Sequence, residues 1–258
     1  MRKLIIVGNG MAGVACAEQI LKHGHDFEIA IYGDETHVNY NRILLSNVLA
    51  GEKSADEIVL NDLDWYCSNR IQAHLGVRVA AIDRAGRRIV DDEGHAAPYD
   101  KLILATGSSP FIPKIPGVDK KNVHVFRTLD DARTLAELAA PGLNVAVIGG
   151  GLLGLEAARG LQLRGCNVTV VHLMDTLMER QLDASGGLYL KRKIEALGIR
   201  VLVGAHTREL TGNGRVEGLR FDSGDCLGAE LVVIAAGIRP NADLARGAGL
   251  EVNRGIVV

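Results

Sequence analysis

The sequence predicts an α/β protein in which one unit, a strand followed by a glycine turn, a helix and a second strand, occurs twice. Apolar runs of strand length precede glycine clusters at residues 8–13 and 149–154, and such runs are typical of buried parallel strands. The two halves then close with similar segments, YDKLILATG at 99–107 and AELVVIAAG at 229–237. Two such matches in the same order indicate an internal duplication.

The first unit begins with the β-branched run LIIV at 4–7, followed by the turn GNGMAG at 8–13. A helical pattern runs from about residue 12 to 22 and stops at Gly24, and FEIAIY at 27–32 predicts the next strand. Short strands of a β-meander are predicted for VRVAAID at 77–83 and RRIV at 87–90. A three-layered unit around a central parallel sheet is therefore expected.

The second unit repeats this order, with NVAVIG at 144–149, GGGLLG at 149–154, a helix, and the strand NVTVVHL at 167–173. Further helices are predicted at 129–140, where Asp130 and Asp131 suit the helix N-terminus, and at about 183–197. The segment 107–119 is rich in proline, which indicates a domain boundary. We expect one domain at 1–112, with 241–258 returning towards it, and a second domain at 115–240.

The spacing of Gly8, Gly10 and Gly13, after a strand and before a helix, is typical of a Rossmann-like dinucleotide-binding turn. The first glycine permits the sharp turn, the second lets the backbone approach a pyrophosphate, and the third lets helix and strand pack closely. An acidic partner for the ribose should end the second strand. Asp34 and Glu35 fit that place, whereas Glu28 lies at the start of the strand.

Gly149, Gly151 and Gly154 form the same pattern in the second unit. His172, not an acid, ends the second strand there, and a neutral imidazole can still hydrogen-bond a ribose hydroxyl. The nearest downstream arginine is Arg180, so the sequence favours NADH over NADPH. Two turns imply two dinucleotides, and FAD with NADH is the economical pair because a flavin accepts a hydride and passes electrons on singly.

The composition argues against several other classes of protein. The net charge is −2 and aromatic residues make up 4% of the chain, which argues against a nucleic-acid partner. The cysteines at 16, 67, 166 and 226 form no CxxC pair, which argues against a metal site and a redox dithiol and favours a reducing, cytoplasmic location. No apolar run reaches the length of a membrane helix, so no membrane partner is expected.

Several segments together carry a family resemblance: VGNGMAG, HVNYNRILLS, YDKLILATGSSPF, VIGGGLLGLEAA, VTVVHLMDTLMERQLD and IRPN. They resemble the flavoprotein part of the large subunit of assimilatory NADH-dependent nitrite reductases, within the wider group of FAD-dependent pyridine nucleotide oxidoreductases. The likeness covers essentially the whole chain. NYNRILLS and HLMDTLMERQLD are the segments most specific to the nitrite reductase branch.

The resemblance implies a set of residues that contact the two cofactors. For FAD these are the first glycine turn with Ala12, the ribose-binding pair Asp34 and Glu35, and the family-matched positions Arg42, Val79, Ala105, Thr106, Gly107 and Arg127. For NAD they are Gly149, Gly151, Leu152, Leu153, Gly154, Glu156 and Gly237, together with His172. Neither a catalytic acid or base nor a metal ligand is implied, because hydride transfer depends on orientation and exclusion of water.

Three departures from the family pattern affect these expectations. Asn47 stands where ferredoxin reductase-like members carry a lysine that pairs with the acid at the position of Glu156. No cysteine lies in the stretch 41–44, which argues against thiol chemistry. The chain ends at Val258, before the last portion of the family's flavin domain, so the first domain is expected to be incomplete and iron–sulfur and sirohaem centres to lie only downstream.

The expected function is that of an FAD-dependent NADH oxidoreductase module, the diaphorase part of a nitrite reductase in nitrate assimilation. It would accept hydride from NADH and pass electrons to iron–sulfur and sirohaem centres or to a small electron carrier, and a homodimer is compatible with this. The first alternative is a stand-alone NADH-dependent reductase for a rubredoxin or ferredoxin. The second, from another class, is a nucleotide-binding fragment without turnover.

Overall fold

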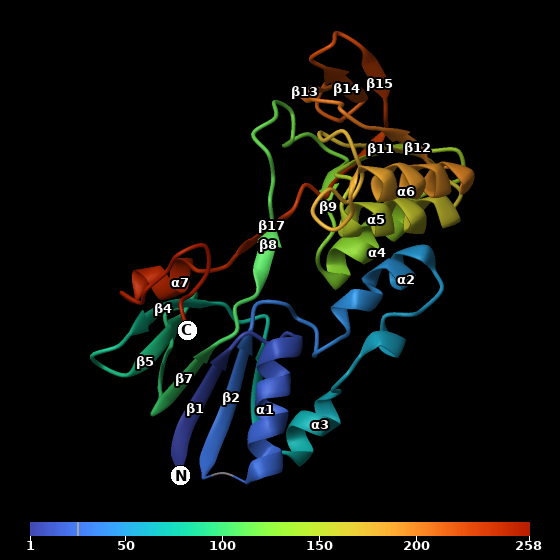
Figure 1. Ribbon diagram of the computed structural model, residues 1–258. Coiled ribbons are helices and arrows are strands. Elements are labelled where there is room, and N and C mark those ends of the chain that lie inside the picture. Colours follow the sequence, from blue (N-terminus) through green and yellow to red (C-terminus); the bar gives the residue numbers. More distant parts are fainter. Residues whose placement is uncertain (25) are drawn as a thin grey trace. The chain divides into compact units, whose positions relative to one another are not determined.

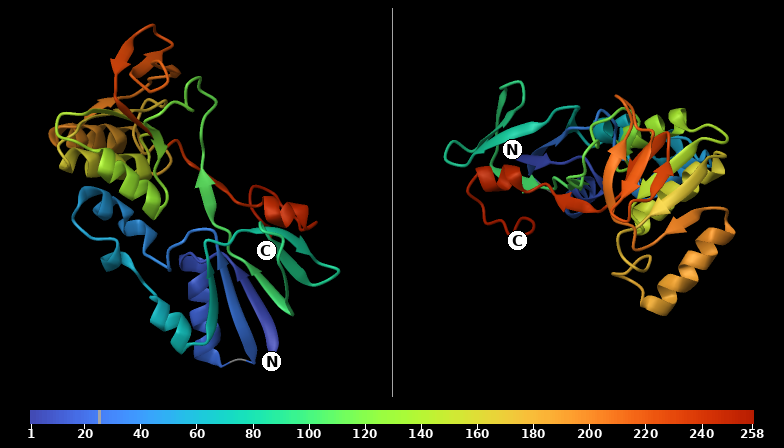
Figure 2. Two further views of the ribbon diagram at one scale, coloured as in Figure 1. Left: turned by 180° about the vertical axis from the view of Figure 1, so that it is seen from behind. Right: turned by 90° about the horizontal axis from the view of Figure 1, so that it is seen from above.

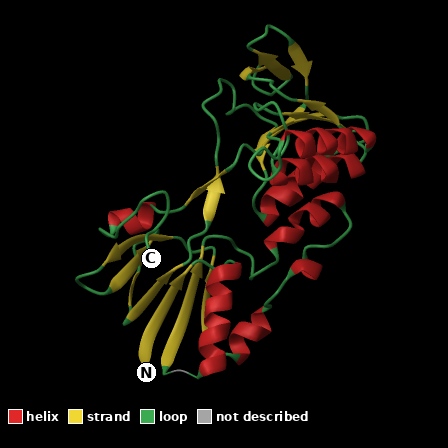
Figure 3. Ribbon diagram, in the orientation of Figure 1, coloured by secondary structure: helices red, strands yellow, loops and turns green. Residues whose placement is uncertain are grey.

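A computed structural model describes residues 1–24 and 26–258 of the chain. The described residues form both helices and strands (Figures 1 and 3), and the predicted α/β fold around parallel sheets is confirmed. The chain divides into two compact units. Unit 1 comprises residues 1–41, 58–109 and 239–258, and unit 2 comprises residues 42–57 and 110–238.

Unit 1 contains a four-stranded parallel sheet in the order β3-β2-β1-β7. Its strands are β1 (Arg2–Val7), β2 (Phe27–Gly33), β3 (Ile71–Leu75) and β7 (Lys101–Leu104). The central strand β1 pairs in register with both neighbours, so that Val7 lies opposite Tyr32 on one side and Leu104 on the other. The carboxyl ends of these strands therefore meet at one edge, where the glycine turn follows β1.

The two faces of this sheet are covered by different layers because side chains alternate along a strand. Leu4 and Ile6 pack towards α1 (Met11–His23) and α3 (Leu63–Ser68), while Ile5 and Val7 pack towards an antiparallel meander (Figure 3). The meander consists of β4 (Val79–Asp83), β5 (Arg88–Asp91) and β6 (Ala96–Pro98). The short helix α7 (Asp243–Gly247) packs against β4.

Unit 2 repeats this design around a five-stranded parallel sheet in the order β12-β11-β10-β16-β9. Its strands are β9 (Val123–Val125), β10 (Asn144–Ile148), β11 (Asn167–Val171), β12 (Arg200–Leu202) and β16 (Leu231–Ile234). Ala146 and Ile148 of the sheet pack in one buried cluster with Leu219 and Phe221 of a second meander. That meander consists of β13 (Thr207–Thr211), β14 (Gly218–Phe221) and β15 (Cys226–Gly228).

The helices of unit 2 are α2 (Leu45–Ala50), α4 (Leu129–Leu138), α5 (Leu152–Leu163) and α6 (Ala184–Ala196). α4 begins with a capping box, in which Thr128 accepts from the Asp131 backbone and the Asp131 carboxylate accepts from the Thr128 backbone. α6 begins at the cap residue Asp183, whose side chain accepts from the backbone of Gly186 at 2.7 Å.

Residues 42–57 belong to the compact unit that carries the second glycine turn, although they stand early in the sequence. They include the 3₁₀ turn η1 (Arg42–Leu44), α2, and the first residues of η2 (Asp56–Ile58). α2 lies against α4 and α5 (Figure 2), and a Cβ on Gly160 would lie 2.9 Å from Leu49 Cγ. The guanidinium of Arg164 donates to the backbone carbonyl of Leu49. The assignment of one cofactor to each domain stays a prediction.

The two remaining strands, β8 (Ser108–Pro110) and β17 (Ile238–Pro240), form a separate two-stranded sheet. β8 lies in the proline-containing segment that the sequence marks as a boundary. Across residues 1–24 and 26–258, none of the helices combines the length and apolar character that spanning a bilayer requires.

Candidate nucleotide-binding sites

The first glycine turn joins β1 to α1 and is fixed by backbone contacts that only glycine permits. Gly8 has φ +121°, and a Cβ there would collide with the carbonyl oxygen of Ala105. A Cβ on Gly13 would collide with the carbonyl oxygen of Gly8, so the helix approaches the strand closely only because Gly13 has no side chain. Gly10 has open space where its Cβ would be, with no atom within 4 Å.

The second glycine turn joins β10 to α5 and repeats these contacts position by position. Gly149 has φ +133°, and its Cβ would collide with the carbonyl oxygen of Ala235. A Cβ on Gly154 would collide with the carbonyl oxygen of Gly149, and Gly151 faces open space. The predicted duplication therefore extends to the individual roles of the three glycines.

Both turns fit the pyrophosphate of a dinucleotide. Gly10 and Gly151 are the N-cap residues of α1 and α5, and neither supplies a side-chain cap to the helix. The first turn of each helix carries no acidic residue. The free N–H groups and positive dipole end of each helix therefore face open space beside a glycine, which is the arrangement that binds phosphate oxygens.

The two predicted ribose-binding acids of the first unit differ in how they are held. The Glu35 carboxylate accepts a hydrogen bond from the hydroxyl of Tyr40 at 2.6 Å, in a partly buried place. Asp34 forms an exposed ion pair with Arg78 at 3.2 Å. Glu35 is thus the better-fixed acceptor at the end of β2, although the contact of either acid with FAD stays a prediction.

The segment Ala105–Gly107 is held in place by Asn241, a residue to which the sequence analysis gave no role. Asn241 donates from Nδ2 to the backbone carbonyl of Thr106 at 2.8 Å. The backbone carbonyl of Asn241 in turn accepts from Thr106 Oγ1 at 2.6 Å. Its backbone N–H donates to the Gly107 carbonyl at 3.0 Å. The IRPN segment marks this residue, but only the tertiary structure shows that it clamps a strand end far away in the sequence.

A polar network behind the first glycine turn also escaped the sequence analysis. Asn9, between the first two glycines, accepts at Oδ1 from the hydroxyl of Tyr66 at 2.7 Å. Asn39 donates to Asn61 at 2.8 Å, and Asn61 donates to Glu18 of α1 at 2.9 Å. Burial raises the pKa of the Tyr66 hydroxyl, which keeps it a hydrogen-bond donor. This network connects the turn with α1 and α3.

His172 lies at the end of β11, as predicted, and both of its ring nitrogens have protein partners. The backbone N–H of Gly150 donates to Nδ1 at 3.0 Å, and Nε2 lies 3.1 Å from the Glu179 carboxylate. The His172 side chain is 10% exposed and that of Glu179 is 30% exposed. Glu179 was not predicted because it lies in a loop after the strand, where residue periodicity carries no information about the path of the chain. The contact of His172 with the nucleotide stays a prediction.

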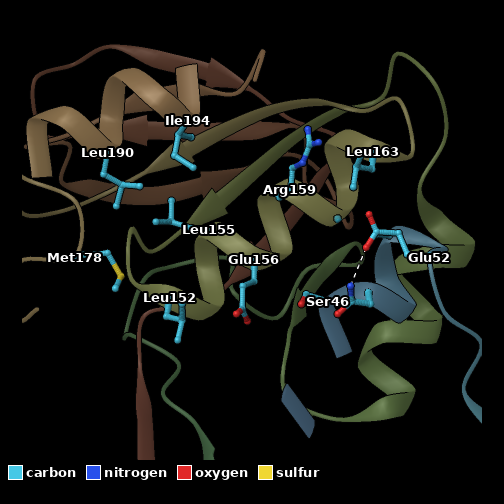
Figure 4. Close-up of a pocket in the computed structure, with 13 residues that line it drawn as sticks. Ser46, Glu52, Leu152, Leu155, Glu156, Arg159, Leu163, Met178, Leu190 and Ile194 are labelled. Carbon is cyan, nitrogen blue, oxygen red and sulfur yellow. Dashed lines mark hydrogen bonds between the residues drawn. The ribbon is translucent and has the colours of Figure 1, made fainter. Parts of the chain in front are cut away.

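Glu156 lines a cavity of about 400 Å³ between α2, α5, α6 and Met178 (Figure 4). Burial raises the pKa of its carboxyl group. Asn47, which also lines the cavity, donates instead to Glu52 at 2.8 Å. Within the part of the chain that the structure describes, Glu156 has no hydrogen-bond partner, as expected from the absence of a lysine at position 47.

The remaining predicted residues fall into both units. Val79 is buried at the start of β4 in unit 1. Arg42 and Arg127 lie in unit 2, where Arg42 donates to the backbone carbonyl of Arg127 at 2.9 Å. Gly107 and Gly237 have φ of +67° and +118° and open space at their Cβ positions. Other predicted positions lie in the first turns of the two helices: Ala12, Leu152 and Leu153.

Comparison with known proteins defines the class. A family model described as pyridine nucleotide-disulphide oxidoreductase matches residues 2–258, so the chain belongs to this family of FAD-dependent pyridine nucleotide oxidoreductases. Membership implies binding of FAD and NAD(P)H. The family resemblance inferred from the sequence is thereby confirmed.

Within this family the chain is similar to proteins of nitrite and nitrate reduction. It is 50% identical over 258 residues to nitrite reductase [NAD(P)H] of Bacillus subtilis (strain 168), covering 100% of this chain and 32% of that protein. It is 46% identical to the assimilatory nitrate reductase electron transfer subunit of the same organism, covering 100% and 34%. The chain therefore spans about a third of the length of these relatives.

A solved structure shows the same fold over the whole chain. The covalent putidaredoxin reductase–putidaredoxin complex matches with a TM-score of 0.95 and 30% identity, covering 100% of this chain and 63% of that one.

Proposed function

We propose that the chain is an FAD-dependent NADH oxidoreductase module, with FAD at the first glycine turn and NADH at the second. The observation that carries this proposal is the repeated turn, in which an uncapped helix N-terminus beside an open glycine follows the central strand of a parallel sheet twice. A bound flavin supplies the chemistry, because it accepts a hydride and passes electrons on singly. The family and its relatives support this assignment.

The side chains of this protein would then serve binding and orientation. The two turns hold pyrophosphates, Glu35 accepts from ribose hydroxyls of FAD, and Asn241 keeps the Thr106–Gly107 segment beside the first turn. Orienting the two reactants and excluding water supply most of what hydride transfer requires. We therefore assign no general acid or base.

NADH is the favoured pyridine nucleotide because His172 directly follows β11 and the nearest downstream arginine is Arg180. The segment between them therefore offers no arginine to bind a 2′-phosphate. Arg180 follows Glu179 directly but forms no ion pair with it in the described part of the chain. NADPH is the less favoured substrate on this argument.

The electron acceptor is proposed from the relatives. The match to nitrite reductase [NAD(P)H] and to an assimilatory nitrate reductase electron transfer subunit supports a diaphorase role in nitrite reduction. The acceptors that we propose, on the family resemblance of the sequence, are iron–sulfur and sirohaem centres outside this chain, in the cytoplasm. A stand-alone reductase for a ferredoxin-type carrier is the second candidate. It is favoured by the structural likeness to putidaredoxin reductase.

A reduction experiment tests the proposal. The full chain is incubated with FAD, freed of unbound flavin and mixed with NADH without oxygen, while the absorbance of oxidised flavin is followed. We expect bleaching by NADH, followed by recovery when ferricyanide is added. Re-oxidation by a ferredoxin or rubredoxin at a comparable rate would favour the second candidate. A chain that binds both nucleotides but never bleaches would be a binding module without turnover, and would contradict the proposal.

A further inference from the structure

The carboxylate of Glu179 is held at the end of β11 by a chain of two hydrogen bonds that starts at the second glycine turn. The backbone N–H of Gly150 is a donor, so Nδ1 of His172 is the acceptor at 3.0 Å and carries no proton. The proton of the neutral ring then lies on Nε2, which donates to the Glu179 carboxylate at 3.1 Å. The backbone thus selects one tautomer of His172, and that tautomer orients the carboxylate.

The loop that carries Glu179 is fixed to the same glycine turn by further contacts. The backbone N–H of Met178 donates to the carbonyl of Gly150 at 3.1 Å. Leu177 is fully buried, and a Cβ on Gly150 would lie 2.6 Å from both Leu177 Cδ2 and His172 Cγ. Gly150 therefore binds the imidazole with its N–H, the loop with its carbonyl, and leaves space for both. Glu179 is placed by the turn itself and not by an independent surface pair.

We propose that Glu179, oriented by His172, is the residue that accepts from the adenosine ribose of NADH and disfavours the 2′-phosphate of NADPH. This inference rests on the proposed placement of NADH at the second glycine turn. The Glu179 side chain is 30% exposed, so one side of its carboxylate remains open to a ligand while the other side accepts from the imidazole of His172. His172 is then a positioning residue, and its own polar atoms are already used by Gly150 and Glu179.

A purely structural hydrogen bond between His172 and Glu179 would make a different prediction. Such a bond would hold the loop in place but would not discriminate between two ligands that differ only by a 2′-phosphate. A carboxylate near the ribose, in contrast, changes the ratio of affinities for ligands that differ only by a 2′-phosphate, because like charges at short range repel. The ratio of the two affinities therefore separates a ribose-binding role of Glu179 from a purely structural one, and measuring it does not require turnover.

The experiment uses the full chain with saturating FAD and two probes, ADP-ribose and 2′-phospho-ADP-ribose, titrated calorimetrically. We expect the native chain to bind ADP-ribose more tightly, and Glu179→Gln to reduce the ratio of the two affinities by about tenfold or more, a change of ~1.4 kcal/mol. The matched control is Glu195→Gln, which removes the same charge from an exposed pair with Lys191 and should leave the ratio unchanged. An unchanged ratio in Glu179→Gln would overturn the inference.

Two further variants separate the inference from the proposed function and test the positioning role. Gly151→Asp places a carboxylate in the open space of the second glycine turn, where the pyrophosphate is proposed to bind. If this variant still binds ADP-ribose as the native chain does, the proposed placement of the nucleotide is wrong. If the native chain itself does not bind ADP-ribose, the placement is also wrong. His172→Gln keeps a donor near the place of Nε2 and should retain most of the ratio, whereas His172→Phe should lose it. Nitrogen NMR of the native chain should show His172 protonated at Nε2 alone, and a proton on Nδ1 would contradict the argument.

Discussion

The hydroxyl of Tyr40 donates to the carboxylate of Glu35 at 2.6 Å, which fixes an acceptor just beyond the end of β2. Tyr40 is itself 5% exposed, so its ring has little freedom to move. In the second unit, His172 holds the carboxylate of Glu179 beyond the end of β11. In each half, a neighbouring side chain therefore holds a carboxylate that follows the second strand of the sheet, although different residues form the two pairs.

We expect Tyr40→Phe to weaken FAD binding without unfolding the chain. Loss of the hydrogen bond leaves Glu35 less well oriented, and a bond to a charged acceptor contributes ~1.5–3 kcal/mol, or about tenfold or more in Kd. Titration of the chain with FAD, followed by flavin fluorescence, measures the effect. Arg78→Gln removes the exposed partner of Asp34 and serves as the control, with an expected change below threefold. Weaker FAD binding in Arg78→Gln with no change in Tyr40→Phe would contradict the assignment of Glu35 and favour Asp34 as the ribose acceptor.

The clamp on the Thr106–Gly107 segment makes Asn241 a site of large stability loss. Asn241→Ala removes the donor to the Thr106 carbonyl and the acceptor of Ser109 Oγ at 2.7 Å. A typical intramolecular hydrogen bond contributes ~0.5–1.5 kcal/mol, so the loss of both should cost about 1–3 kcal/mol at most. Urea unfolding should show this loss, while Asn253→Ala, at an exposed site near the C-terminus, should change stability by less than about 0.5 kcal/mol. A loss below that size for Asn241→Ala would mean that the segment keeps its conformation unaided.

The close approach of α1 to β1 should make Gly13 intolerant of any side chain. Gly13→Ala drives a Cβ into the Gly8 carbonyl, and overpacking of this kind costs ~1–3 kcal/mol or more. The matched control is Gly247→Ala in α7, where no atom lies within 4 Å of the Cβ. That change should be neutral or stabilise the chain by up to ~1 kcal/mol, because alanine favours the helix. Midpoints of urea unfolding compare the two, and similar midpoints would contradict the steric argument.

The cavity beside Glu156 should make stability depend on pH. Burial raises the pKa of this carboxyl in the folded chain, so the protonated form is favoured there and the cost of ionisation appears as pH rises through the raised value. Glu156→Gln removes that cost, so we expect a higher Tm than the native chain at neutral pH. The gain should disappear below the ordinary glutamate pKa of ~4.3. Glu137→Gln, at an exposed site on α4, controls for loss of charge, and a gain independent of pH would contradict this cause.

The glycine turns and central strands could be predicted because local rules determine them. A glycine whose Cβ would strike a backbone carbonyl has no substitute, so the spacing of Gly8 and Gly13 reveals both the turn and the helix approach. The apolar runs of β1 and β10 are buried on both faces and stand out by composition alone. The helix predicted at 183–197 is observed as α6, and its start is also set by a local rule, because Asp183 is the N-cap residue.

What the sequence could not supply depends on contacts between distant segments. Asn241 clamps Thr106 from 135 residues away, and no periodicity reports such a pair. Residues 42–57 belong to unit 2 because Leu49 packs over Gly160, which only the tertiary structure reveals. Glu179 lies in an irregular loop, where the path of the chain follows from the hydrogen bonds of Gly150 and not from residue type.

The most direct test of the account is a pair of charge insertions at the two open glycines. Gly10→Asp and Gly151→Asp each place a carboxylate at a helix N-cap with an extended backbone, where aspartate is a good cap and should not unfold the chain. Each carboxylate would occupy the proposed pyrophosphate site. Calorimetric titration of both variants with FAD and with NADH, beside the neutral Gly10→Asn and Gly151→Asn, should show that Gly10→Asp loses FAD alone and Gly151→Asp loses NADH alone, each by about a hundredfold in Kd (~2.7 kcal/mol). Loss of both cofactors in either folded variant, or the reverse pairing of variant and cofactor, would contradict the account.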